Sequence, residues 1–309
     1  MVLLAAWYSW LVPLWLVAAG GLAAMGAMML VYLLLKLVFP KVAAIARTAA
    51  KEGWNQPLFW VELALGSLLL VLFVFIPYNT FGEDIKVIKD SGLTLIMLLS
   101  IGLAVWLASV SISAEIEGRT ALTLLSKPVK RSQFVLGKFL GVLAPAFTMF
   151  VLLSMVFLAT ISYKVPYEAR ELSHSAPTAQ QCQEEIVQIV PALVLAFLET
   201  AVLASISIAI STKLPMLPNL IICFSIYVLG HLTPLLVESS IGKLPLVTFM
   251  GRLIATLLPV LEFFRAEGAV ATGQAVPWEY VGSAGVYAGL YVLIALLLAL
   301  LLFDNRDLA

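Results

Sequence analysis

The sequence contains few charged residues. Only 12% of its 309 residues are Asp, Glu, Lys or Arg, whereas an average soluble domain carries about 25%. Hydrophobic residues make up 62% of the chain, and the polar stretches between apolar runs are too short for a separate soluble domain. These features exclude a soluble globular protein and indicate one that crosses a membrane several times.

Motifs of catalysis and nucleotide binding are also missing. The chain has no GxxxxGK[ST] phosphate-binding loop, no HExxH zinc motif and no GxSxG nucleophile motif. Glu171, His174 and Cys182 share one polar stretch, but a metal site needs more ligands at firmer spacing. A disulfide between Cys182 and Cys223 is not expected, because the two residues lie in a polar and an apolar environment. We therefore predict no catalytic residue, no metal site and no enzyme activity in this chain, and no nucleic-acid partner.

The apolar runs predict an all-α polytopic membrane protein. Each run contains enough apolar residues to cross about 30 Å of hydrocarbon as a helix, and none shows the alternation expected of a membrane barrel. A six-span domain is expected over residues 58–309, with spans at 58–77, 92–112, 137–162, 188–211, 217–237 and 281–303. With the N-terminal segment the total is about seven.

Residues 1–37 form an extra apolar segment before this domain. The run is too long for a cleavable signal peptide and has no basic start. Either one helix spans the membrane from about Pro13 to Leu37, or Gly20-Gly21 turns a tight hairpin. Span length favours a single transmembrane helix.

A basic helical stretch follows at residues 38–57. Val42, Ile45 and Ala49 fall on one face of this helix, which predicts that it lies along the cytoplasmic membrane surface. The longer segment 238–280 is mixed in character, and Arg252 and Pro259 argue against a full span there.

The basic residues set the predicted orientation. Placing 38–57, 113–136, 212–216 and the C-terminus on one side, with Lys36 and Lys138 reaching toward it, collects 11 of the 18 Lys and Arg residues there. Because cytoplasmic loops carry the excess of Lys and Arg, this side is predicted to be cytoplasmic.

The loop 113–136 has sequence features that membrane topology alone does not explain. Glu115 and Arg119 form a favourable helical pair, and a short apolar stripe accompanies them. Pro128 stops the helix, and a second helix is expected to start near Ser132. The positive-inside rule explains the basic residues of the loop but not its apolar stripe. Such a stripe in a solvent-facing loop favours a protein partner.

The stretch "EIEGRTALTLLSKPVKRSQFVLGK", from Glu115 to Lys138, resembles the cytoplasmic signature of permease subunits of type-2 ATP-binding-cassette (ABC) transporters. Copper-enzyme maturation and gliding-machinery permeases look similar. "LPVLEFFRAEGAVATGQAVP" and the closing "FDNRDL" also resemble that family. The resemblance implies a coupling loop, whose candidate residues are Glu115, Glu117, Gly118, Arg119, Thr120, Leu125, Ser126, Pro128, Arg131, Gly137 and Lys138.

The resemblance also implies the partners. The loop would dock on a separate P-loop ATPase, present in two copies, which would hold the ATP and magnesium, so this chain would carry no cofactor. A second permease copy or a paralogue would complete the transporter in a bacterial cytoplasmic membrane, with the C-terminus in the cytoplasm. The helix at 38–57 would touch the same ATPase. The N-terminal span departs from the six-span pattern. An ATP-independent carrier or channel, or a membrane scaffold subunit, is the alternative function.

Glu199 is predicted to be the one acid deep inside a span, and it is the candidate functional residue there. An ionised acid in hydrocarbon costs about 2.5–3.5 kcal/mol on insertion scales, so Glu199 must face protein or water, or be protonated. It either contacts substrate or a proton, or makes an interhelical hydrogen bond. His231 is expected to be packed or interfacial.

Two glycine pairs, Gly137/Gly141 and Gly285/Gly289, have the spacing that lets helices approach closely. We expect packing within the chain, with a contact between two permeases as the alternative.

Overall fold

The protein is built from helices. The computed structural model describes residues 9–76, 84–117, 130–171, 177–238, 249, 253, 258–271 and 273–304, and no strand occurs among them. The elements are α2 (Leu14–Val38), α3 (Pro40–Trp54), α4 (Pro57–Phe73), α5 (Asp84–Glu117), α7 (Arg131–Glu171), α8 (Ala179–Ser211), α9 (Met216–Glu238), the 3-10 helix η2 (Leu261–Phe264), α11 (Glu267–Ala271) and α12 (Trp278–Asp304).

Helix length and composition give five to six candidate spans among the described residues. Helices α2, α5, α7, α8 and α12 qualify alone, while α3 and α4 qualify only as a pair, bent by 59°. The apolar part of α9, Met216–Leu232, belongs to the shorter class of 10–17 residues. The prediction of an all-α polytopic membrane protein is confirmed, and the seventh predicted span depends on this shorter helix.

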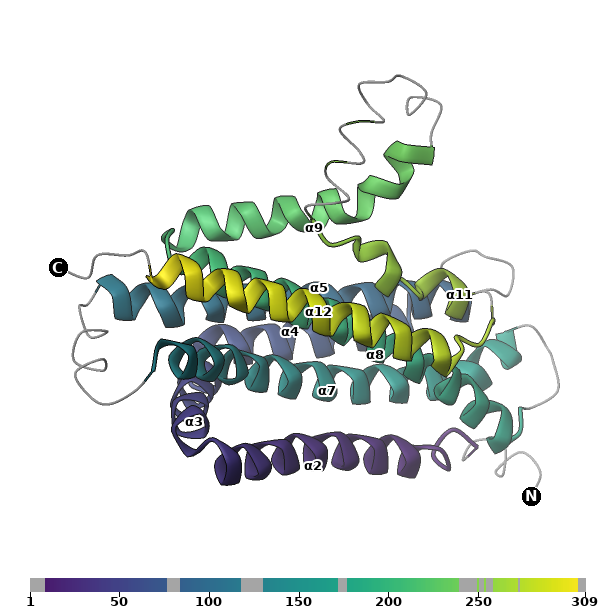
Figure 1. The fold of residues 1–309 in the computed structure, drawn as a ribbon. Coiled ribbons are helices and arrows are strands. Elements are labelled where there is room, and N and C mark those ends of the chain that lie inside the picture. Colours follow the sequence, from purple (N-terminus) through teal and green to yellow (C-terminus); the bar gives the residue numbers. More distant parts are fainter. Residues whose placement is uncertain are drawn as a thin grey trace.

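Helix α8 forms the centre of the bundle, and α5, α7 and α12 pack around it (Figure 1). About two thirds of the most apolar window of α8 is buried, compared with 6% for α2. Helix α2 therefore lies at the periphery. It continues through Gly20 and Gly21, so this segment is a single helix rather than a hairpin. Gly21 allows its close approach to α7, because a Cβ there would lie 2.4 Å from Sδ of Met155.

Helix α3 packs closely against the start of α7. Its small residues face α7, and the polar residues on its other side are exposed. A Cβ on Gly137 would lie 2.7 Å from Cβ of Ile45, and one on Gly141 would lie 2.5 Å from Cβ of Ala49. The Gly137/Gly141 pair therefore serves packing within the chain. The apolar face of α3 contacts protein rather than lipid.

The two ends of the bundle differ. At one end, named here the loop end, α5 ends, α7 and α9 begin, and α12 ends (Figure 1). Contacts confirm this arrangement: the rings of Phe134 and Phe303 stack with centroids 5.6 Å apart, and Asn219 reaches Ser109 and Ser211. The opposite end, where α5 and α8 begin and α7 ends, is named the charged end. The helix ends that flank the predicted coupling loop therefore lie at the same end of the bundle as the end of α12.

The predicted polar loop at 163–187 is mostly helical, which corrects the sequence interpretation. Helix α7 continues to Glu171, and α8 begins at Ala179 after the N-cap Thr178, whose side chain forms a capping box with Gln181. Cys182 is buried in α8. Polar helical turns that project beyond the hydrocarbon resemble a loop on a hydropathy scale, which explains the error.

Part of the 238–280 segment lies outside the described residues, including Arg252. The described part contains η2 and α11, and Pro259 is not helical. The segment packs on α12, because the Tyr287 hydroxyl accepts from the amide N of Val260 at 2.9 Å. The Tyr291 hydroxyl donates to the carbonyl of Leu258 at 3.1 Å.

Candidate functional site

The structure describes only part of the predicted coupling loop, because residues 118–129 lie outside the described residues. Glu115 and Glu117 belong to the last turn of α5, and Arg131 opens α7. The helix start expected near Ser132 is therefore correct. The remaining loop predictions, Gly118, Arg119, Thr120, Leu125, Ser126 and Pro128, lie outside the described residues.

Lys138 ties together the two helices on either side of this loop. Its Nζ donates to Oγ of Ser111 at 3.0 Å and to the carbonyl O of Ser111 at 3.2 Å. It also lies 5.8 Å from the ring centroid of Phe134. The side chain is 3% exposed, so it does not reach out to solvent as predicted. Its bonds fix the end of α5 against the start of α7, and the loop between them is therefore anchored at both ends.

Glu199 lies at the middle of the bundle and is fully buried in α8. Its Oε1 is 3.6 Å from Nε2 of His231 on α9. The other ring nitrogen, Nδ1, is 3.1 Å from the carbonyl O of Tyr227. A carbonyl only accepts hydrogen bonds, so Nδ1 carries a hydrogen. The contact between Nε2 and the Glu199 carboxyl group is then attractive when a second proton is present, either on Nε2 or on the carboxylate. The pair is therefore able to hold that proton inside the protein.

A second intramembrane acid, Glu62 on α4, escaped the sequence analysis. Its Oε1 faces α5, 3.8 Å from where a Cβ on Gly102 would stand. Its Oε2 is buried without a hydrogen-bond partner among the described residues. The signal was visible in the sequence, because Glu62 falls inside the predicted span 58–77. Glu199 is therefore not the single acid at membrane depth.

Asn219 organises a buried polar cluster near the loop end. Its Nδ2 lies 2.6–2.8 Å from the hydroxyl oxygens of three serines on α5 and α8, namely Ser109, Ser207 and Ser211. Its Oδ1 accepts from the thiol of Cys223. Both described cysteines are free. Polar groups buried among helices contribute to stability when they are satisfied, so this cluster joins α5, α8 and α9.

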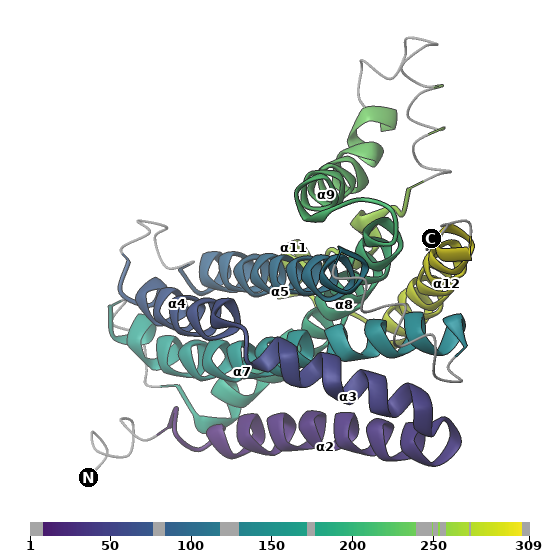
Figure 2. The same ribbon diagram turned by 90° about the vertical axis from the view of Figure 1, so that its left-hand side faces the viewer.

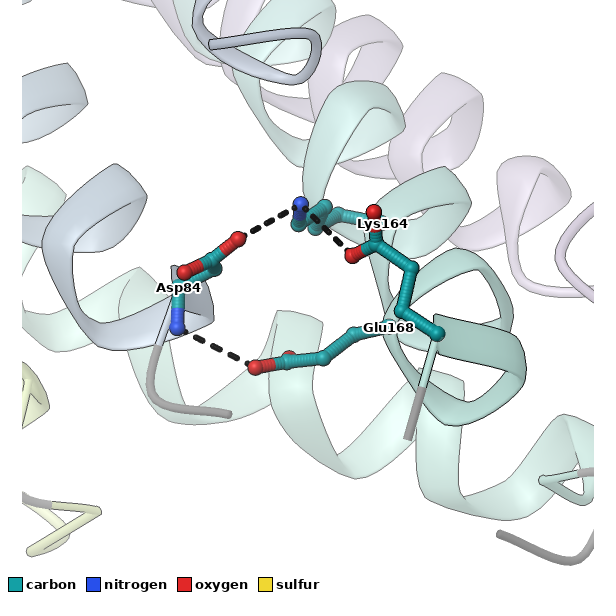
Figure 3. Close-up of polar contacts among 4 residues, drawn as sticks. Asp84, Lys164 and Glu168 are labelled. Carbon is teal, nitrogen blue, oxygen red and sulfur yellow. Dashed lines mark hydrogen bonds and ion pairs between the residues drawn. The ribbon is translucent and has the colours of Figure 1, made fainter. Parts of the chain in front are cut away.

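The charged end holds a cluster of ion pairs (Figure 3). Nζ of Lys164 lies 3.1 Å from Oδ2 of Asp84 and 3.7 Å from Oε2 of Glu171. Oε1 of Glu168 accepts from the backbone N–H of Asp84 at 3.1 Å. Lys89 pairs with Glu185 beside this group. The lysines are 1% and 3% exposed, whereas the carboxylates of Asp84, Glu185 and Glu171 are 15%, 35% and 49% exposed. These partly buried ion pairs join α5, α7 and α8.

The residues that share the polar stretch around His174 do not form a metal site in the described part of the chain. Among the described residues, no group of three or more His, Cys, Asp or Glu side chains is placed to hold a metal ion. Glu171 pairs with Lys164, and Cys182 is buried one helix away from it. His174 lies outside the described residues.

Two comparisons with known proteins bear on this arrangement. Residues 82–308 match the family model described as "ABC-2 family transporter protein". No curated protein matches the chain. The matched region begins just before α5 and includes the loop, the Glu199 pair and the charged end, whereas α2, α3 and α4 precede it.

Proposed function

The chain belongs to the ABC-2 family of transporter proteins, and on this premise we propose that ATP hydrolysis on a separate subunit drives its transport activity. The family match covers most of the chain and is the observation that carries the proposal. The chain itself is an integral membrane permease with no phosphate-binding loop. The energy source must therefore come from another subunit, for which we propose a P-loop ATPase that binds ATP and magnesium. We propose two copies of it in a bacterial cytoplasmic membrane.

The loop end is the proposed docking surface for the ATPase. Lys138 fixes the two helices that lead into residues 118–129, and α3 is packed against the same stretch of α7. Exposed residues of α3, including Arg47 and Lys51, lie on the face away from α7. A force applied to the loop would act on α5, α7 and α3 together, which is what energy coupling requires.

We expect Glu117→Lys to abolish ATP-driven transport and co-purification of the ATPase. The residue lies at the last turn of α5, where reversal of a charge disrupts a docking surface through like-charge repulsion. Pro128→Ala should have the same effect by removing the helix stop. The measurement is the ATPase recovered with a tagged chain, together with substrate transport in vesicles.

Glu184→Lys provides the matched control. It is the same charge reversal at an exposed position near the charged end, and it should leave co-purification unchanged. Normal ATPase recovery and normal transport with the Glu117 variant would refute the docking proposal.

We expect Ser132→Cys to be protected from a membrane-impermeant thiol reagent added outside intact cells. Ser132 is exposed at the loop end, and Gln180 is exposed near the charged end. Gln180→Cys should therefore be labelled from outside. Both natural cysteines are buried, and replacing them with serine removes their background. Labelling of Ser132→Cys from outside would invert the proposed orientation, including the cytoplasmic C-terminus.

An ATP-independent carrier is the second candidate function. The observation in its favour is the buried Glu199–His231 pair, because proton-coupled carriers place acids and histidines at membrane depth. Transport in vesicles loaded without ATP would support the carrier. Transport that requires both ATP and the co-purified subunit would support the permease.

A further inference from the structure

A groove lies along α7, between Trp10, which precedes α2, and the end of α4. Figure 2 shows α2 and α4 themselves on opposite sides of α7. The groove has a volume of about 290 Å³, and its lining comes from Trp10, from the end of α4 and its next residues, and from α7. Two of its three walls precede residue 82, where the family match begins. The groove is therefore an addition to the matched domain.

The lining of the groove is apolar. No charged side chain contributes to it. The hydroxyl of Thr160, which forms part of the floor, already donates to the carbonyl O of Phe157 at 2.6 Å. The floor is buried, with Val74 2% exposed, whereas Phe75 at the rim is 59% exposed. The opening thus continues the exposed apolar surface that faces lipid in a membrane.

A fixed aromatic pair closes the groove toward the charged end. The hydroxyl of Ser162 donates to the carbonyl O of Trp10 at 2.8 Å, and the rings of Trp10 and Tyr163 meet edge to face with centroids 5.4 Å apart. Trp and Tyr side chains favour the level of the lipid headgroups. Val156 lies seven residues earlier on α7, about 10 Å deeper along the helix.

We propose that this groove binds one acyl chain of a phospholipid from the leaflet at the charged end. The glycerol region lies level with Trp10 and Tyr163, and the chain runs toward Val156. Water is excluded at this depth, and an empty groove would lose the dispersion contacts of its walls. Lipid tails are as apolar as leucine, so packing rather than hydrophobic transfer holds the chain there. This site is independent of the proposed ATPase coupling.

The test uses the full chain in vesicles of phosphatidylcholine that carries a diazirine on one acyl chain. After illumination, we expect adducts on Val156 and Ala159 at about three times the level on exposed residues of α12, a ratio that corresponds to a preference of about 0.6 kcal/mol. Ala159→Trp fills the groove and should reduce the adducts on Val156 about threefold, back to the level on exposed residues. Ala23→Trp, the same substitution at an exposed position of α2, should leave them unchanged.

A second variant keeps the proposal testable if Ala159→Trp misfolds. Phe75→Ala removes an exposed rim side chain and should lower the adducts about twofold while leaving the thermal midpoint unchanged. Equal labelling in Ala159→Trp and Ala23→Trp would overturn the proposal. So would adducts that appear only after deletion of residues 2–8, because the chain's own N-terminal segment would then be the occupant.

Discussion

Gly141→Ala is expected to destabilise the protein, although alanine is the better helix former. A Cβ on Gly141 would stand 2.5 Å from Cβ of Ala49 and 2.8 Å from the carbonyl O of Ala46. Both atoms are fixed to the backbone of α3, so no flexible side chain can move aside. Overpacking of this kind costs about 1–3 kcal/mol, which exceeds the ~1 kcal/mol by which alanine exceeds glycine in helix propensity. The measurement is the thermal midpoint of the purified protein in detergent, which should fall, and further still for Gly141→Leu.

The second glycine pair supplies the control for this experiment. A Cβ on Gly289 would meet nothing within 4 Å, so Gly289→Ala should leave the midpoint unchanged or raise it slightly. Both substitutions replace the second glycine of a GxxxG pair within a helix, but Gly141 is buried against α3 and Gly289 is exposed on α12. Equal shifts of the two midpoints would show that the α3–α7 contact contributes nothing to stability. A fall in the thermal midpoint of Gly289→Leu that depends on protein concentration would instead indicate a contact between two permeases.

Lys164→Met should destabilise the charged end by about 1–3 kcal/mol, because it removes a charged partner from carboxylates that are only partly buried, Asp84 at 15% and Glu171 at 49% exposed. Lys164 is 1% exposed and is the cation between Asp84 and Glu171. It also lies 4.8 Å from the ring centroid of Tyr167. The measurement is again the thermal midpoint, combined with hydrogen exchange at the start of α5, where protection should decrease.

The double variant Lys164→Met/Asp84→Asn separates charge from packing. Removing both members of a buried pair costs less than removing one, so the double variant should recover part of the lost stability. Lys51→Met removes an exposed lysine from α3 and should change the free energy of unfolding by less than ~0.5 kcal/mol. A double variant less stable than Lys164→Met would contradict the assignment of the pair.

Much of the fold could be predicted because membrane helices are recognisable in a sequence as long apolar runs. The helix over residues 14–38 and the start of α7 near Ser132 agree with the sequence predictions. The helical turns around Lys164 and Cys182 were missed, because hydropathy detects the part of a helix inside hydrocarbon and not its polar extension. Helix α7 runs 9 residues past the predicted end of its span at residue 162, to Glu171.

The candidate site was less accessible to sequence reasoning. Glu199 was identified, because an acid within an apolar run is conspicuous. Its partner was not, because His231 lies 32 residues away on another helix and no spacing rule connects the two. The serines around Asn219 were missed for the same reason: they come from different helices, and only the packing of α5, α8 and α9 brings them together.

Helix α7 has a mechanical consequence for the whole molecule. Its 41 residues give a helical path about 60 Å long. Figures 1 and 2 show that this path is bent, with the first turns of α7 lying beside α3 and across the direction of the rest of the helix. Pro145 and Pro166 lie inside the helix, and proline is a common cause of such bends. A push on the first turns therefore becomes movement along the membrane-crossing part only as far as the bend resists opening and closing.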